Sequence, residues 1–217
     1  MPLLLQAQNY SLQFAGLNLV KSLNFSFEQG ATYRLIGPTG RGKTLFFLSM
    51  TQLIEAHYSQ LELIGESCSN FSPEAWRTKI LYLPQMLSLS GNLVRDVFEQ
   101  AFSLKVHHTK KLDYKKLDEY LQFLEFVPST FLNRAVLGLS GGEAQIVSLL
   151  RALLLIPDII LADESWSAMD KDLKQKIIAL LKHEKGLAFQ SLVFISHDEN
   201  RFFPDEKIFD LDCGVRQ

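Results

Sequence analysis

The stretch Gly37-Pro38-Thr39-Gly40-Arg41-Gly42-Lys43-Thr44 carries the spacing G-x-x-x-x-G-K-T, which is typical of a loop that wraps phosphate groups. Residues 32–36 before it have the composition of a strand, and residues 45–50 after it continue into an apolar helix. A phosphate loop needs this strand–loop–helix context. The alternative is an ordinary glycine-rich turn with a chance Lys-Thr pair, which requires neither flank. The sequence therefore predicts a phosphate-binding loop.

Each residue type in this loop has a physical task. Gly37, Gly40 and Gly42 allow the backbone to curl until consecutive N–H groups point inward. The helix that follows begins with its positive end facing the same place. Lys43 supplies a positive charge for the outer phosphates, and the hydroxyl of Thr44 is placed to ligate Mg²⁺.

Composition favours one large unit with a sizeable core, because 47% of the 217 residues are apolar and 21% are charged. The net charge of −2 gives no indication of a nucleic-acid-binding surface. Cys68 and Cys213 are too few for a disulfide framework or a cysteine-based zinc site. We therefore expect a reducing compartment, with both cysteines as small apolar fillers. No run reaches the ~18 apolar residues of a membrane span, and we expect no signal peptide.

Periodicity predicts further elements around the loop. Apolar residues alternate with polar ones between Leu12 and Phe27, which indicates strands in residues 1–30. We expect a helix from Lys43 to about Ala56, a short helix that opens at Pro73, and a strand at residues 79–83.

Residues 85–138 differ in character, because apolar side chains recur there at helical spacing without a strong strand pattern. We interpret this region as a helical subdomain inserted into an α/β core. A basic run lies within it, and interleaved Asp113, Asp118 and Glu119 favour a solvated helix face. The run consists of Lys105, His107, His108, Lys110, Lys111, Lys115 and Lys116. The two histidines would point apart on a helix, so we assign them no metal.

The segment Leu139-Ser140-Gly141-Gly142-Glu143 opens an apolar helix that runs to about Leu155. A serine followed by two glycines makes a helix terminus that is able to receive an anion. Ser140 is placed to cap the helix, and Glu143 in the first turn suits its dipole. Taken alone, the segment favours a simple helix start.

Two buried strands end in chemically useful side chains. Residues 159–162 are apolar, and Asp163 and Glu164 follow them directly. Ligands of parallel sheets bind outside the carboxyl ends of strands. Asp163 is thus placed to hold Mg²⁺ through water, and Glu164 to take a proton from an attacking water. His197 follows the apolar residues 192–195 and is expected at the same sheet edge. The alternatives are a surface acidic pair and a solvated histidine.

Taken in order, these segments resemble the ATP-binding subunit of ABC transporters. The resemblance covers residues 3–212 and rests on the phosphate loop, Gln85, the signature Leu139–Glu143, the acidic strand, Ser167–Asp170 and His197. Residues 81–97 are also similar, more weakly, to small bacterial subunits for iron or metal export.

The fold that the resemblance implies is an α/β P-loop NTPase core of the RecA type. It has a mostly parallel sheet, an N-terminal antiparallel β portion and the inserted helical subdomain. One ABC ATP-binding domain would span residues 1–217, with its core in 1–84 and 152–217 and the helical subdomain in 85–151.

The resemblance also implies residue roles. Phe14 would stack on adenine, with Tyr10 as the alternative, and such base–aromatic stacking is worth ~1–3 kcal/mol. Gln85 would contact Mg²⁺ and the attacking water, and would link the site to a membrane partner. Glu164 would be the catalytic base, and His197 would contact the γ-phosphate of ATP.

The implied assembly is a head-to-tail pair of two copies, or of this chain and a homologous subunit, around two ATP·Mg²⁺. Ser140, Gly141, Gly142 and Glu143 would bind the ATP of the partner, and Asp170 would contact the partner beside the hydrolysis site. Hydrolysis would loosen the pair and drive a separate integral membrane permease. The chain would lie in the cytoplasm, peripheral on the inner face of the cell membrane.

Four residues depart from the usual family pattern, although none of them removes a catalytic group. Leu45 replaces a hydroxyl residue, Glu143 a glutamine and Ile146 an arginine, and Trp166 is unusually bulky. Two other functions stay open. One is a soluble ABC-type ATPase acting on nucleic acid or ribosomes, which the absence of a long extension disfavours. The other is a nucleotide-gated assembly module with little turnover, which the presence of Glu164 and His197 disfavours.

Overall fold

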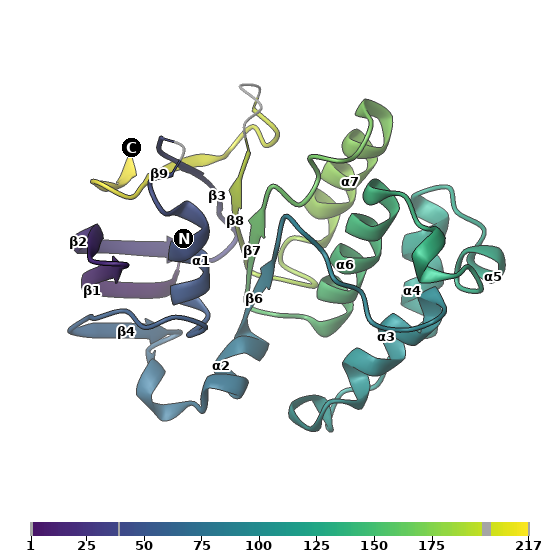
Figure 1. Cartoon of the computed structure of the whole chain (residues 1–217), viewed down its shortest axis with the longest axis horizontal. Helices are drawn as coiled ribbons and strands as arrows, with labels where there is room; N and C mark the ends of the chain where they lie inside the picture. The colour runs from purple at the N-terminus through teal and green to yellow at the C-terminus, as the bar shows by residue number, and fades with distance from the viewer. Residues whose placement is uncertain (1, 39, 197–200, 217) are drawn as a thin grey trace.

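The computed structural model describes residues 2–38, 40–196 and 201–216. Within them, two sheets are formed, one with the strand order β10-β9-β3-β8-β7-β6 and the other with the order β2-β1-β4-β5 (Figure 1). The strands are β1 (Leu3–Phe14), β2 (Leu17–Glu28), β3 (Thr32–Ile36), β4 (Gln60–Leu63), β5 (Glu66–Ser67), β6 (Ile80–Leu83), β7 (Ile159–Asp163), β8 (Ser191–Ile195), β9 (Lys207–Asp210) and β10 (Gly214–Arg216).

The first sheet is parallel except where β10 pairs with β9, and the second sheet is antiparallel. An α/β core with a mostly parallel sheet and an N-terminal antiparallel portion is therefore confirmed. The strands expected in residues 1–30 are also confirmed, and β1 and β2 pair as an antiparallel hairpin along most of their length.

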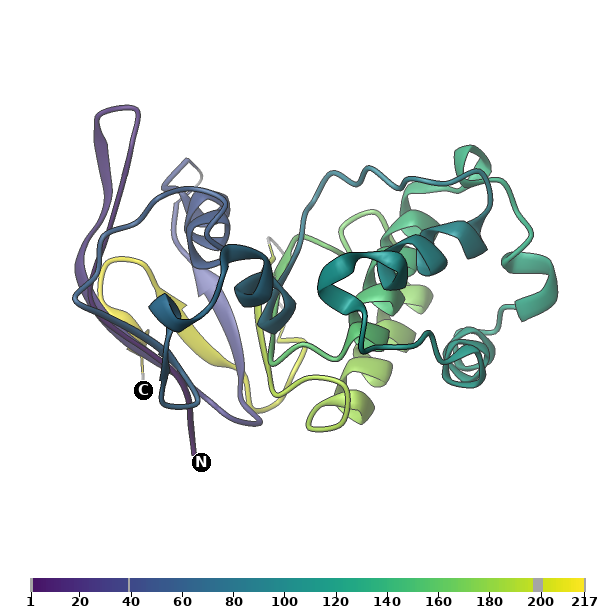
Figure 2. The ribbon, with the colours of Figure 1, turned by 90° about the horizontal axis from the view of Figure 1, so that it is seen from below.

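Helices cover both faces of the parallel sheet and extend to the end of the molecule opposite β1 and β2 (Figures 1 and 2). They are α1 (Lys43–Met50), α2 (Pro73–Lys79), α3 (Val94–Ser103), α4 (Tyr114–Phe123), α5 (Pro128–Phe131), α6 (Gly141–Leu155) and α7 (Lys171–Glu184). Short 3₁₀ turns lie at η1 (Cys68–Asn70), η2 (Lys105–His107) and η3 (Val136–Gly138). Helices α3 to α6 are inserted between β6 and β7, as the helical spacing predicts. None of the helices in the described part of the chain combines the length and apolar character needed to span a bilayer.

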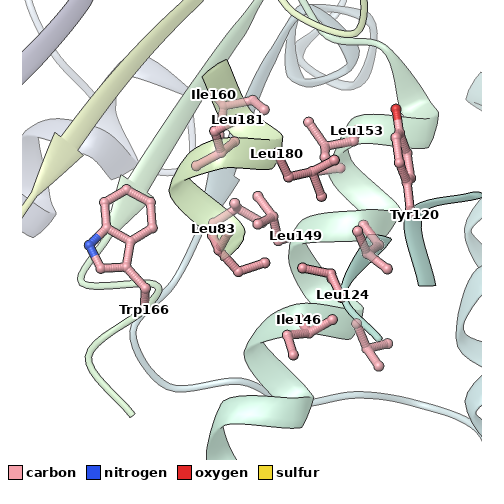
Figure 3. Packing of buried hydrophobic residues seen from close by; sticks show 14 of the residues in the cluster. Leu83, Tyr120, Leu124, Ile146, Leu149, Leu153, Ile160, Trp166, Leu180 and Leu181 are labelled. Atoms are coloured by element: carbon pink, nitrogen blue, oxygen red, sulfur yellow. The ribbon is translucent and has the colours of Figure 1, made fainter. Parts of the chain in front are cut away.

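Two apolar clusters lie on opposite faces of the parallel sheet, and β7 contributes to both. Ile159 and Leu161 belong to the cluster that includes β1, β2 and α1, whereas Ile160 and Ala162 belong to the one formed with α6 and α7. Figure 3 shows the second cluster, in which Leu149 and Leu153 of α6 lie beside Leu180 of α7. Burial on both faces explains why this strand is continuously apolar.

Several expected boundaries are wrong. Helix α1 ends at Met50 rather than Ala56, because Gln52 adopts a left-handed backbone with φ 56°. The hydroxyl of Thr51 also bonds the Phe47 carbonyl at 3.2 Å, at the end of this helix. Lys79 belongs to α2, so the next strand begins at Ile80. Strands β4, β5, β9 and β10 have no counterpart among the elements that the sequence predicts. Cys213 is exposed rather than an apolar filler, whereas Cys68 is buried as expected.

The basic run is not one solvated helix face. It is spread over η2, the segment after it and α4, and His107 is buried. The Lys110 ammonium donates to the Leu155 carbonyl at the end of α6, where a cation suits the helix dipole. The Lys116 ammonium lies 3.1 Å from the buried Glu184 carboxylate of α7. Part of the run therefore fastens the helical insertion to the core.

Candidate nucleotide-binding site

The predicted phosphate loop connects β3 to α1 and has the required curl. Gly42 has φ 89°, and a Cβ atom there would lie 2.8 Å from Cδ1 of Leu19 on β2, so only glycine fits. The Lys43 ammonium donates to the carbonyls of Gly37 at 2.7 Å and Pro38 at 3.2 Å. These bonds connect the lysine side chain at the end of the loop to the backbone at its start. Thr39 lies outside the described residues.

The neighbouring residues Gly40, Arg41 and Leu45 differ in their surroundings. Gly40 lines the cleft in front of the loop. The Arg41 guanidinium forms an exposed ion pair with Asp212 at 2.6 Å. Leu45, which departs from the usual hydroxyl residue, packs partly buried against the cluster that includes β1 and β2.

The carboxyl edge of the parallel sheet brings polar groups to the loop. The Thr44 hydroxyl donates to Oδ2 of Asp163 at 2.7 Å, and the Tyr82 hydroxyl donates to the same oxygen at 3.1 Å. Burial, followed by the charge of Asp163, raises the pKa of Tyr82, so its phenol stays protonated as a donor. Sequence reasoning missed Tyr82, although it lies one strand away from the acid.

Glu164 and Gln85 meet at the same edge, where the Gln85 amide donates to Oε2 of Glu164 at 2.9 Å. Glu164 has φ 48°, a left-handed backbone that turns the chain away from β7. A cleft of about 280 Å³ lies between the loop and this edge, lined by Gly40, Gly42, Lys43, Thr44, Leu45, Asp163, Glu164 and Ile195. His197 lies outside the described residues, and β8 ends two residues before it.

The donor set at this edge fits Mg²⁺. It consists of the Thr44 hydroxyl, the Asp163 carboxylate and the Gln85 amide oxygen, and Mg²⁺ prefers oxygen ligands that leave room for water and phosphate. The cleft that Thr44 and Asp163 line has room for both water and phosphate.

The signature segment forms a fully capped helix start. Ser140 Oγ accepts from Glu143 N–H at 3.2 Å, and Oε2 of Glu143 accepts from Ser140 N–H at 2.8 Å. Arg134, which sequence reasoning missed, donates to both oxygens of Glu143. The Arg134 guanidinium holds the pKa of Glu143 below its usual value. The Glu143 carboxylate thus bonds to the helix start and to Arg134 within its own chain. The ion pair with Arg134 needs a carboxylate, which explains the presence of glutamate instead of glutamine.

The structure does not bring this signature to the phosphate loop of the same chain, since none of its residues lines the cleft at Lys43. Instead, Gly141 and Gly142 pack against the loop after β7, where a Cβ atom on Gly142 would lie 3.2 Å from the Ala168 carbonyl. Gln145, also missed, is buried and bridges this loop. Its oxygen accepts from Ala168 N–H at 3.2 Å, and its nitrogen lies 3.5 Å from the Glu164 carbonyl.

The side chains of Phe14 and Tyr10 differ sharply in solvent exposure. Phe14 sits at the tip of the β1–β2 hairpin and is 47% exposed. Tyr10 is fully buried, and its hydroxyl bonds Ser49 at 2.7 Å, so the alternative role for Tyr10 is wrong.

Asp170 is exposed and caps α7 by accepting from Leu173 N–H at 2.9 Å. Trp166 points inward and packs against Phe194, with ring centroids 5.4 Å apart.

Comparison with known proteins places the chain in a family. The ABC transporter family model matches residues 20–167. The molybdate/tungstate import ATP-binding protein of Methanocaldococcus jannaschii is 36% identical over 181 residues, which cover 82% of this chain and 58% of that protein. The probable iron export ATP-binding protein of Escherichia coli is 27% identical over 210 residues, or 96% of this chain and 91% of the relative.

Solved structures agree on the fold. A bacterial Atm1-family ABC exporter with ATP bound superposes with a TM-score of 0.80 at 20% identity, over 98% of this chain and 38% of that chain.

A further sequence relative, the spermidine/putrescine import ATP-binding protein of Fusobacterium nucleatum, is 32% identical over 88% of this chain. The chain spans 58% and 50% of the lengths of the two import proteins. Because the family model covers well over half of its residues, the chain belongs to the ABC transporter family, as an ATP-binding domain.

Proposed function

We propose that this chain binds and hydrolyses ATP as the nucleotide-binding subunit of an ABC transporter and drives separate membrane permease subunits. The observation that carries the proposal is the meeting of Thr44, Asp163 and Glu164 in one cleft beside the phosphate loop, with Gln85 bonded to Glu164. A surface acidic pair would have no reason to contact both the threonine that ends the phosphate-loop motif and a glutamine that follows another strand.

The residues divide the chemistry between them. Lys43 and the loop amides hold the outer phosphates of ATP. Thr44, Asp163 and Gln85 would hold a Mg²⁺ ion, which would supply positive charge for the phosphate oxygens. Glu164 accepts a proton from the water that attacks the γ-phosphorus, while the bond to the bridging oxygen breaks and ADP leaves. Gln85, already bonded to Glu164 Oε2, orients that carboxylate. General-base assistance of this kind contributes ~10²–10⁴ in rate.

The second half of each site comes from a partner subunit in this proposal. Ser140 and its glycines lie at a capped helix terminus that does not line the cleft of its own chain. Two chains packed head to tail would bring that terminus to the γ-phosphate of the partner's ATP. Hydrogen bonds to a charged group contribute roughly 1.5–3 kcal/mol each. Loss of the γ-phosphate removes several of them, so hydrolysis loosens the pair.

A permease contact is supported by the surface beside Gln85. Met86 follows this glutamine directly and is 88% exposed, which is unusual for a large apolar side chain.

Bound to the permease, the chain would lie on the inner face of the cell membrane. Full-length similarity to the iron export relative favours metal export as the transport process. Residues 85–151 form the helical subdomain that carries this surface, within a single domain of residues 1–217.

The substitution Glu164→Gln tests the proposal. The variant keeps the shape and the bond to Gln85 but cannot accept a proton, so ATP binding persists and phosphate release slows at least ~10²-fold. Size-exclusion chromatography with Mg-ATP is expected to show a stable dimer. Glu66→Gln, on exposed β5, serves as the control and keeps the parent rate. Undiminished hydrolysis in Glu164→Gln, or only monomer in Mg-ATP, contradicts the proposal.

A further inference from the structure

We propose that Tyr82 is a positioning residue for the Mg²⁺ of the nucleotide site and that it acts through Asp163. The inference rests on the proposed function, because it requires that the cleft bind ATP with a divalent cation. Tyr82 itself is not a predicted ligand of the metal or the nucleotide.

The pairing of the two strands places the tyrosine. In the parallel register of β6 and β7, Tyr82 lies opposite Leu161. Side chains alternate along a strand, so Tyr82 shares a sheet face with Leu161 and, two residues further on, with Asp163. Helix α1 covers this face, and its Phe47 meets the Tyr82 ring in an edge contact with centroids 6.3 Å apart. The packed ring directs the hydroxyl to the acid at the end of the neighbouring strand.

Two hydroxyl donors then converge on one carboxylate oxygen. Oδ2 of Asp163 accepts from Thr44 at 2.7 Å and from Tyr82 at 3.1 Å. Thr44 uses its proton in this bond, so the lone pairs of its oxygen stay available to a metal ion. The second donor fixes the plane of the Asp163 carboxylate. Asp163 is only 3% exposed, so its carboxylate is sensitive to each bond.

A neutral donor suits this place better than a cation would. The phenol orients the carboxylate without cancelling its negative charge, so the attraction of Asp163 for Mg²⁺ is retained. Groups that bond to metal-binding side chains typically change metal affinity by 10–100-fold when they are removed. We therefore expect the Tyr82 hydroxyl to contribute about 10-fold to metal affinity.

The test separates metal binding from nucleotide binding. Tyr82→Phe removes the hydroxyl and keeps the ring that packs on Phe47. Mn²⁺, a spectroscopic substitute for Mg²⁺, is titrated into the full chain with a non-hydrolysable ATP analogue and followed by electron paramagnetic resonance. The variant is expected to bind Mn²⁺ about 10-fold more weakly, while its affinity for a fluorescent ATP analogue in EDTA equals that of the parent.

Tyr58→Phe is the matched control, because the Tyr58 hydroxyl contacts Cys68 Sγ at 3.4 Å and does not line the cleft. This variant is expected to match the parent in both titrations. Equal Mn²⁺ affinity in Tyr82→Phe and the parent overturns the inference and leaves the proposed function intact. Equal losses of metal-dependent and metal-free nucleotide affinity in Tyr82→Phe also overturn it, since they indicate a general structural role. A parent chain that binds no nucleotide refutes the proposed function instead.

Discussion

Replacement of Gln145 by methionine tests how the loop after β7 is held in its active shape. Gln145 is 4% exposed and lies in the signature helix α6. Its side chain meets both ends of the loop that begins at Glu164 and continues through Ala168. Methionine has a similar length and no polar end, so the substitution removes both contacts while it nearly preserves volume.

The expected loss follows from the two distances. The Ala168 N–H donates at 3.2 Å and would be left buried without this acceptor, which costs about 1–3 kcal/mol. The contact to the Glu164 carbonyl is 3.5 Å long, at the limit for a hydrogen bond, and adds little. We therefore expect Gln145→Met to lower the free energy of unfolding by about 1–3 kcal/mol.

The consequence for turnover is larger than the consequence for binding. In the sequence, Gln145 lies outside the phosphate loop, and its hydrogen bonds go to Glu164 and Ala168, so ATP affinity is expected to stay unchanged. The loop that begins at Glu164 loses its bond at Ala168, and a displacement of about 1 Å in a reacting group can cost ~10²-fold in rate. We expect kcat to fall by up to that factor.

Urea unfolding and steady-state ATP hydrolysis measure the two effects. Gln122→Met, an exposed glutamine on α4, is the control and is expected to change stability by less than about 0.5 kcal/mol. A Gln145→Met variant as stable as this control would refute the assigned bridge. So would a variant that loses ATP affinity while its kcat stays at the parent value.

Three other predictions address the loop, the hairpin tip and the signature. Lys43→Ala is expected to abolish ATP binding in a fluorescence titration, and unchanged affinity would show that the lysine does not hold the phosphates. Phe14→Ala is expected to weaken ATP binding by ~1–3 kcal/mol without a change in stability, whereas Leu17→Ala, exposed on the same hairpin, should have no effect. Because Arg134 lowers the pKa of Glu143 from 4.5, the carboxylate stabilises the fold above pH 4.5 and loses this effect as pH falls further. The stability difference between the parent and Glu143→Gln should shrink below pH 4.5, and a difference that stays constant down to pH 3 would contradict the pairing.

Local chemistry made much of the fold predictable. The phosphate loop, the capped start of α6 and the buried strand β7 each depend on residues within a few positions of one another. The left-handed backbone at Gly42 and the helix cap formed by Ser140 and Glu143 can both be predicted from the residue types and their spacing. The roles assigned to Phe14, Gln85, His197 and the signature stay predictions until the variants above are measured.

Tertiary contacts decided what the sequence alone left open. Strands β4 and β9 are too short to stand out as patterns, and they form because β1 and β3 offer them edges for pairing. Tyr10 and Phe14 look alike in the sequence, yet packing buries the first and exposes the second.

The sequence by itself determined the phosphate loop, the order of the main elements and the acids at the end of β7, because short-range backbone preferences and apolar periodicity decide them. Only the tertiary structure identified Tyr82, Arg134 and Gln145, since each acts through a partner on a different element. A hydrogen bond needs a partner within about 3.2 Å. Distances of that kind exist only once the strands and helices have packed.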